Sequence, residues 1–286
     1  MTESKNQNFN HLKIHSQYSI CEGAVKIDDL KDLSKSNKIK SLGLCDTSNL
    51  CGALEFAEKI SKSGTQPIIG TQINFKFADT VGLLPLFALN KDGYKRIIEL
   101  SSLSYLNNDQ LSDPHLNFNE LFNKNNGVAI FSGTTHGLFG ELFNKGKFSE
   151  IKNLYSKLIS NFQDRFYIEI QRHGDLNERG FEKLNLNLSL ELEAPIIATN
   201  EVFYLDKDMY EAHDALICIK DKTYINEKNR LKFTDQHYLK NNAEMTELFS
   251  DIPEALENNY NFPLRCSFRP LFSNPILPNI SSEKDG

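Results

Sequence analysis

Short β-like runs alternate with longer amphipathic runs along most of this chain, and no other feature of the sequence constrains the fold as much. Alternation of this kind is typical of a parallel sheet wrapped by helices. The chain has 286 residues, a length that still suits one large α/β barrel. We therefore predict an α/β fold of the barrel type.

The predicted elements follow from these runs. The predicted strands are 10–15, 41–45, 67–77, 83–89, 128–132, 166–171 and 195–199. The predicted helices are 27–37, 50–63, 93–105, 120–123, 138–143, 148–162 and 178–192. Several prolines follow Phe262, so we expect a polar tail over 1–9, one domain over 10–270 and a proline-rich linker over 271–286.

Composition excludes several classes of protein. The formal net charge of -6 provides no general basic field for nucleic acid or an anionic membrane. The five cysteines form no CxxC pair, and the polar first ten residues lack the apolar core of a signal peptide, which favours a reduced, cytoplasmic protein. The longest apolar run, 81–89, is about half of a membrane span and is better interpreted as a buried strand.

Candidate site residues lie near the expected strand ends. In the opening run FNHLKIHSQYS, His11, Lys13 and His15 would share one face of a strand, where a lysine opposes metal binding. The polar residues at the ends of the predicted strands are His15, Asp46, Gln72, Thr134, His173, Asn200 and Glu201. Only His15, Asp46, His173 and Glu201 are good metal ligands, and each taken alone is more simply an ordinary polar loop residue.

Several longer segments carry a family resemblance. They are HLKIHSQYSICEGAVKIDDL, LGLCDTSNLCGALEF, QPIIGTQINF, GYKRIIELSS, VAIFSGTTHG, YIEIQRHG, PIIATNEVFYLDKDMYEAHDALICI and LFSDIPEALENN. Together they resemble the polymerase and histidinol phosphatase (PHP) domain at the N-terminus of the bacterial replicative DNA polymerase III alpha subunit. The resemblance implies a distorted TIM-like (β/α)7 barrel. It also makes 271–286 a linker toward an absent palm domain.

The same resemblance shows where this sequence departs from metal-binding PHP domains. The family's ligand positions carry Lys13, Thr47, Gln72, Tyr105, Thr134 and Phe203 here, whereas His15, Asp46, His173 and Glu201 keep a ligand or a conservative replacement. The replacements supply no negative charge at neutral pH, so we expect no metal cluster. A single weakly bound divalent ion on the four retained residues stays open.

Lys13 has two interpretations. With Arg172, which precedes His173, it could turn the former metal pocket into an anion pocket. Alternatively it forms an internal salt bridge with Asp46 or Glu201, which we favour because a buried carboxylate needs a partner.

The resemblance implies a role in DNA replication. The parent chain would be a DNA-directed DNA polymerase, a nucleotidyltransferase that uses Mg²⁺, and its catalytic carboxylates would lie in the palm outside this segment. The segment alone would then support the palm and thumb, dock a separate proofreading exonuclease subunit and meet DNA through the parent enzyme, with no membrane contact. The alternative is a residual metal-dependent phosphoesterase, acting as a 3′–5′ exonuclease or pyrophosphatase. A PHP enzyme of amino-acid biosynthesis is disfavoured by the segments after residue 195.

Overall fold

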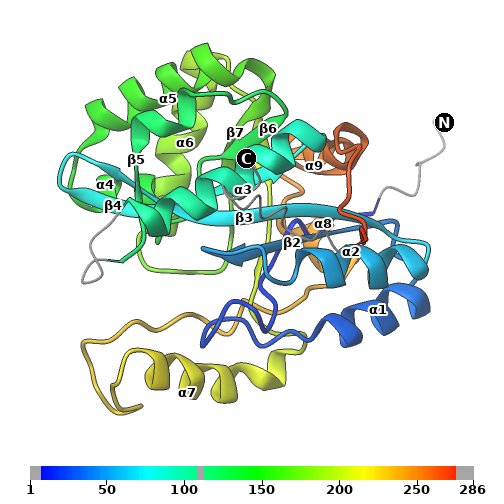
Figure 1. Ribbon diagram of the computed structural model, residues 1–286. Coiled ribbons are helices and arrows are strands. Elements are labelled where there is room, and N and C mark those ends of the chain that lie inside the picture. Colours follow the sequence, from blue (N-terminus) through cyan, green and yellow to red (C-terminus); the bar gives the residue numbers. More distant parts are fainter. Residues whose placement is uncertain (1–7, 108–112, 275–286) are drawn as a thin grey trace, which may run out of the picture.

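A single curled sheet runs through the molecule in the computed structural model, which describes residues 8–107 and 113–274 (Figure 1). Along the sheet the strands are β8 (Ile196–Ala198), β7 (Phe166–Ile170), β6 (Val128–Phe131), β4 (Thr80–Ala88), β3 (Gln66–Phe77), β2 (Ser41–Thr47), β1 (Lys13–Ile14) and β9 (Glu201–Val202). The short strand β5 (Leu116–Asn117) pairs with β3 outside this path. All seven predicted strands are therefore confirmed, whereas β5 and β9 were not predicted.

Most neighbouring strands are parallel, with one exception around β4. This strand pairs antiparallel with both β3 and β6. It follows β3 through a tight turn at Ala78 and Asp79, and Ala78 has a φ of 52°. A hairpin therefore replaces one helical crossover, and this distorts the repeating barrel pattern.

The two ends of the sheet lie close together in the chain. Only Thr199 and Asn200 separate β8 from β9, although these strands stand at opposite ends of the sheet. Three Cα steps reach at most about 11 Å, so the sheet must curl until its edges meet. The barrel-like α/β class predicted from the sequence is thereby confirmed.

Helices cover the outside of the sheet. They are α1 (Ile27–Ser36), α2 (Ala53–Lys62), α3 (Lys91–Leu106), α4 (Leu138–Asn144), α5 (Phe148–Phe162), α6 (Glu178–Leu192), α7 (Tyr210–Lys220), α8 (Asn242–Leu248) and α9 (Pro253–Asn261). The 3₁₀ turns are η1 (Phe118–Phe122), η2 (Gln163–Arg165), η3 (Lys207–Met209) and η4 (Phe262–Arg265). Figure 1 shows α7 at the periphery, apart from the other long helices.

The predicted helices agree with the observed ones up to α6. The exception is 120–123, which falls in the 3₁₀ turn η1. Helices α7 to α9 were not predicted. Of the predicted terminal segments, 1–7 and 275–286 lie outside the described residues. Among the described helices, none combines the length and the apolar character that a membrane crossing needs.

The barrel interior is filled by apolar side chains from most of the strands and from residues next to them. This layer consists of Leu12, Cys45, Ile68, Phe87, Leu89, Ala129, Phe131, Tyr167 and Ile197, with Phe262 and Cys266 from the chain after α9. The Phe262 ring packs on Phe87, Phe131 and Tyr167 with centroid distances of 5.5, 5.0 and 5.7 Å. The C-terminal part of the domain therefore closes one end of the interior.

Gly43 in β2 allows a close approach of two backbones. Its N–H donates to the His11 carbonyl at 2.7 Å. A Cβ on residue 43 would lie only 2.3 Å from the Leu12 carbonyl oxygen. Glycine is therefore required for the segment before β1 to reach the position in which Lys13 enters the barrel.

Candidate functional site

Polar side chains form a second interior layer next to the apolar one. Side chains in a strand alternate between two faces, so Glu169 shares the inner face with Tyr167, and Gln72 shares it with Ile68. These two residues meet Lys13 from β1 and Glu201 from β9. The polar layer thus combines residues from four strands.

Lys13 is a fully buried cation at the centre of this layer. Its Nζ lies 3.3 Å from Glu169 Oε1 and 3.3 Å from Glu201 Oε1, while the lysine side chain has no exposed surface. Both distances are long for a hydrogen bond, and Nζ has no hydrogen-bond partner of good geometry. Burial favours the neutral amine, but Glu169 and Glu201 outweigh it and raise the pKa of Lys13. Lys13 therefore stays an ammonium at neutral pH.

Glu201 contacts Gln72 and His15 in addition to Lys13. Its Oε1 accepts from Gln72 Nε2 at 2.6 Å and lies 3.1 Å from His15 Nε2. Burial opposes its ionisation, yet Lys13 and His15 outweigh that effect and hold the pKa of Glu201 well below its ordinary value. The carboxylate is therefore charged and already committed to protein partners.

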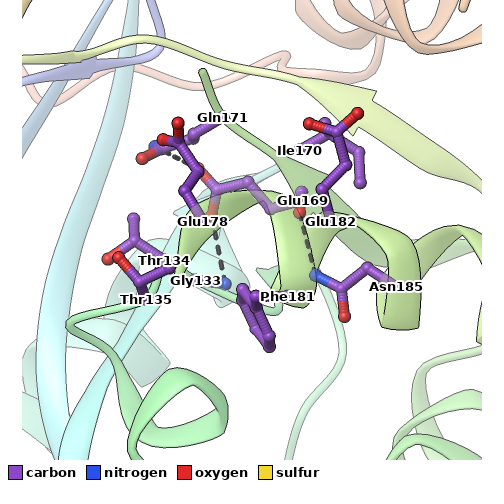
Figure 2. A pocket seen from close by; sticks show the side chains of 10 residues that line it. All are labelled: Gly133, Thr134, Thr135, Glu169, Ile170, Gln171, Glu178, Phe181, Glu182 and Asn185. Carbon is purple, nitrogen blue, oxygen red and sulfur yellow. Dashed lines mark hydrogen bonds between the residues drawn. The ribbon is translucent and has the colours of Figure 1, made fainter. Parts of the chain in front are cut away.

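Glu169 is the second carboxylate that contacts Lys13. Its Oε2 accepts from the Gly133 amide at 3.1 Å, and its Oε1 accepts from Gln171 Nε2 at 2.8 Å and from the Thr199 hydroxyl. Figure 2 shows Glu169 in the small cavity that it shares with Gly133 and Gln171. This cavity has a volume of about 10 Å³, which is room for roughly one water molecule and for no phosphoester.

Asp46 is not a partner of Lys13, contrary to one of the two pairings expected from the sequence. Its Oδ1 accepts from the Ser16 amide at 2.7 Å and from the Ser19 hydroxyl at 2.8 Å. The Ser16 hydroxyl donates to Oδ2 at 2.8 Å. Burial raises the pKa of Asp46, against the effect of these hydrogen bonds. The serine loop after β1 therefore uses the oxygens that a metal ion would need.

The other substituted positions are spread around this layer. Phe203 is buried and packs on the His15 ring with centroids 4.7 Å apart. The Thr47 hydroxyl lies 3.4 Å from His15 Nδ1, and Thr134 Oγ1 accepts from the His136 amide at 3.1 Å. Tyr105 is exposed near the end of α3. The fold therefore brings Phe203 and Thr47 beside His15, whereas Tyr105 faces solvent.

Arg172 forms its ion pairs outside the polar layer, away from Lys13, so its contacts do not support the anion pocket, the less favoured of the two interpretations of Lys13. Its guanidinium forms ion pairs with Glu182 and Asp251, each at 2.6 Å. Its side chain also packs over the Phe249 ring at 5.2 Å. Consecutive residues after a strand point to different sides, so Arg172 joins α6 to the segment after α8 while His173 points inward.

His173 belongs to a cluster that the sequence did not reveal. Its ring stacks on that of His237, with centroids 4.0 Å apart and an angle of 5° between the planes. Asp175 Oδ2 lies 3.3 Å from His237 Nε2. One donor atom each from His173, Asp175 and His237 falls within 4.8 Å of the others, the one such group of three or more found among the described residues. His237 follows β9 by more than thirty residues, so no local pattern connected it to His173.

The donor set at the former ligand positions does not fit the metal cluster implied by the resemblance. A cluster needs free carboxylate and imidazole lone pairs around a cation. Here the Lys13 ammonium stands between Glu169 and Glu201, and Asp46 is satisfied by Ser16 and Ser19. The retained residues His15 and Glu201 contact each other. We therefore assign no chemical step to metal ions in this layer.

Comparisons with known proteins agree with the architecture. Residues 11–173 match the family model of the PHP domain. The chain is 35% identical to the DNA polymerase III subunit alpha of Caulobacter vibrioides, over 98% of this chain and 25% of that protein. The same subunit of Rickettsia conorii is 36% identical, over 96% of this chain and 23% of that protein. The subunit of Vibrio cholerae is 31% identical, over 95% of this chain and 24% of that protein. The chain thus spans about a quarter of the length of these relatives and matches their N-terminal portion. The family match covers more than half of the sequence, and the chain belongs to the PHP domain family.

Proposed function

We propose that this chain is the N-terminal PHP domain of the catalytic alpha subunit of a bacterial replicative DNA polymerase, with a structural role. The observation that carries this proposal is the buried Lys13, which lies 3.3 Å from both Glu169 and Glu201 in the polar layer. An ammonium there replaces the charge of a metal ion without supplying a Lewis acid. The three relatives named above are alpha subunits, and this chain covers about a quarter of the length of each. They support the assignment to a larger polymerase chain.

The proposed role has two parts. The domain, taken as residues 10–270, supports the palm and thumb of the parent polymerase, and the stretch 271–286 links it to them. It also docks a separate proofreading exonuclease subunit, in the cytoplasm where replication takes place. DNA and Mg²⁺ belong to the parent enzyme in this proposal, and the segment itself carries no catalytic residue.

Exposed apolar side chains around the end of α7 are the docking surface that we assign to the exonuclease. Ile219, Tyr224 and Ile225 are exposed there, and so is Ile20. The segment that carries Ile20 lies against α7, because the Glu22 carboxylate lies 3.8 Å from Lys220 and the Glu22 carbonyl accepts from His213 at 2.8 Å. Exposed apolar groups in one place favour an interaction surface.

The test is binding of the purified proofreading exonuclease to the alpha subunit, measured by calorimetry with Tyr224→Ser and Ile219→Ser. We expect each variant to weaken binding by about tenfold or more, as for an interface hot spot. Leu190→Ser is the matched control, because Leu190 on α6 is 81% exposed and Tyr224 is 82% exposed. If both variants bind the exonuclease as tightly as the unmodified alpha subunit, this surface is ruled out. If the unmodified alpha subunit does not bind the exonuclease, the docking role is ruled out.

The alternative, a residual phosphoesterase, makes a different prediction. It requires hydrolysis of a 3′-ended DNA or of pyrophosphate by the segment alone, and loss of that hydrolysis in His15→Gln or Asp46→Asn. The Lys13 ammonium between Glu169 and Glu201 and the committed oxygens of Asp46 argue against it. Hydrolysis that survives purification and disappears in both variants would replace the structural role by an enzymatic one.

A further inference from the structure

A surface groove of about 660 Å³ runs along α6 and plays no part in the proposed role. Its lining includes Arg172, Arg179, Glu182, Lys183, Leu186 and Leu248, and it is called the α6 groove below. Leu248 is the last residue of α8, whereas Arg179, Lys183 and Leu186 lie on successive turns of α6. At about 1.5 Å per residue, Lys183 lies about 6 Å and Leu186 about 10.5 Å from Arg179 along the helix axis. The groove therefore has a cationic end and an apolar end.

The carboxylates that line the α6 groove are already engaged by protein donors. The two oxygens of Glu182 accept from Arg172 at 3.1 and 2.6 Å. The two oxygens of Glu178 accept from the amides of His173 and Gly174 at 2.7 and 2.6 Å. All four oxygens thus have a partner, and these carboxylates offer no free acceptor to a ligand.

The cations of the α6 groove are not engaged in this way. Arg179 and Lys183 are exposed, and the side chain of neither forms a salt bridge or a hydrogen bond with another described residue. A guanidinium carries five N–H donors and an ammonium carries three. An anionic ligand in the groove therefore gains two cationic partners without breaking an existing ion pair.

The apolar end gives the ligand a second requirement. Leu186 and Leu248 are partly buried, because one side of each packs on the main core. Leu190, one turn further along α6, is 81% exposed. Covering such side chains removes apolar surface from water, which favours binding. The ligand should therefore carry an apolar group next to its anionic groups.

This combination fits an acidic peptide better than a nucleic acid. Single-stranded nucleic acids are usually bound by aromatic rings that stack on the bases, together with many cations along the backbone. None of the described residues that line the α6 groove is a Phe, Tyr or Trp, and only two of its cations lack partners. Leucine side chains instead match the aliphatic side chains of a peptide.

The position of the groove indicates that the peptide belongs to a second polypeptide. The described C-terminal stretch lies at the amino ends of β3 and β7, because Gln66 donates to the Cys266 carbonyl at 2.7 Å and Arg265 pairs with Asp164 at 2.8 Å. Arg172 follows the carboxyl end of β7, so the α6 groove lies at the opposite end of the sheet. A link to the palm would therefore leave the domain away from the groove.

We propose that the α6 groove binds an extended acidic segment of a second polypeptide. Two carboxylates of this segment pair with Arg179 and Lys183, and an apolar side chain packs on Leu186 and Leu248. In an extended chain, residues two apart point to the same side at a spacing of about 6.6 Å, close to the spacing of these partners on α6. The recognised pattern is therefore acidic, any residue, acidic, any residue, apolar. This site is separate from the α7 surface and does not rest on the exonuclease assignment.

The test uses a fluorescein-labelled peptide that contains Asp-Ser-Asp-Ser-Leu, titrated with the purified chain and followed by fluorescence polarisation. We expect saturable binding with a Kd below about 1 mM. Arg179→Gln and Lys183→Gln should each weaken binding about threefold, and the double variant about tenfold. Lys157→Gln on α5 is the matched control, because Lys157 is also exposed without a salt bridge to a described residue. It should bind within about 1.5-fold of the unmodified chain, since salt screens a distant charge.

Two control peptides separate the charged and the apolar contributions. A peptide with Asn in place of both Asp residues, and one with Ser in place of Leu, should each bind at least about fivefold more weakly. All three lysine and arginine positions are exposed, so the variants should keep the melting temperature of the unmodified chain.

Four results would overturn the proposal. The first is no saturable binding at chain concentrations up to about 1 mM. The second is equal binding of the Asn peptide, and the third is an equal loss of affinity in Lys157→Gln, which would show a general charge effect. The fourth is displacement of the peptide by a short oligothymidylate, which would assign the groove to nucleic acid. Binding of the exonuclease is measured separately with the α7 variants, so either proposal can fail without the other.

Discussion

At the residue scale, the central feature is one lysine that holds two carboxylates inside a barrel. Buried ion pairs add little net stability, because desolvation offsets most of the attraction. Removing one partner is different, since it leaves uncompensated charge in the interior. The single Lys13 ammonium contacts both Glu169 and Glu201, so its loss should be more damaging than the loss of either carboxylate.

The corresponding prediction concerns Lys13→Met. We expect the free energy of unfolding to fall by about 3 to 5 kcal/mol, because Glu169 and Glu201 would remain buried without a cation. Urea denaturation at pH 7 measures this change. In the double variant Lys13→Met with Glu201→Gln, part of the loss should be recovered. A surface control, Lys31→Met, should change stability by less than about 0.5 kcal/mol, and a Lys13 variant as stable as this control would contradict the prediction.

At the element scale, α9 connects the beginning of the barrel to its end. Asn259 is fully buried, accepts from the Asn10 amide at 2.8 Å and donates to the carbonyl oxygens of Asn10 and Ala198 at 2.9 and 3.0 Å. One side chain thus joins the segment before β1 to the end of β8. Because these segments lie next to each other at the closure of the sheet, α9 stabilises the point at which the barrel edges meet.

We therefore predict that Asn259→Ala destabilises the domain by about 2 to 4 kcal/mol, since buried backbone groups lose their partners. Thermal unfolding followed by circular dichroism gives the change. Asn261→Ala, an exposed position on the same helix, is the control and should leave the melting temperature nearly unchanged. Equal melting temperatures for the two variants would show that α9 does not hold the barrel edges together.

At the scale of the whole molecule, buried histidines make the fold sensitive to acid. Burial lowers the pKa of His11 to about 4, against the effect of its contact with the Lys240 carbonyl, and the pKa of His173 is lowered to a similar value. The unfolded chain takes up protons on these residues near pH 6.5, whereas the folded chain takes them up near pH 4. The unfolded state therefore binds more protons between these values, and stability decreases as the pH falls from 6.5 to 4.

The prediction compares the pH dependence of stability in the unmodified chain, called the parent here, with that in His11→Gln. A glutamine amide can still donate to the Lys240 carbonyl, as His11 Nε2 does at 2.8 Å, but it does not titrate. Between pH 7 and pH 5 the free energy of unfolding of the parent should fall by about 2 kcal/mol more than that of the variant. Urea unfolding at the two pH values gives the difference, and the comparison cancels the contributions of all other groups. Parallel pH profiles for the two proteins would contradict the assignment.

The sequence by itself determined the order of the main strands and the helices up to α6, because alternating burial and helical periodicity are local properties of the chain. The family resemblance also indicated that Lys13 replaces a metal ligand, and of the two partners expected for it, Asp46 and Glu201, the structure has Glu201 at 3.3 Å. The second carboxylate, Glu169, lies mid-strand on an inward-facing position of YIEIQ, a signal that the strand period could have revealed.

Only the tertiary structure decided which residues meet. It assigned Asp46 to the serine loop and Arg172 to Glu182 and Asp251, and it brought His237 onto His173. The physical reason is that curling of the sheet joins strands far apart in sequence, while the partner of a buried charge depends on distances of a few ångströms that no local pattern contains.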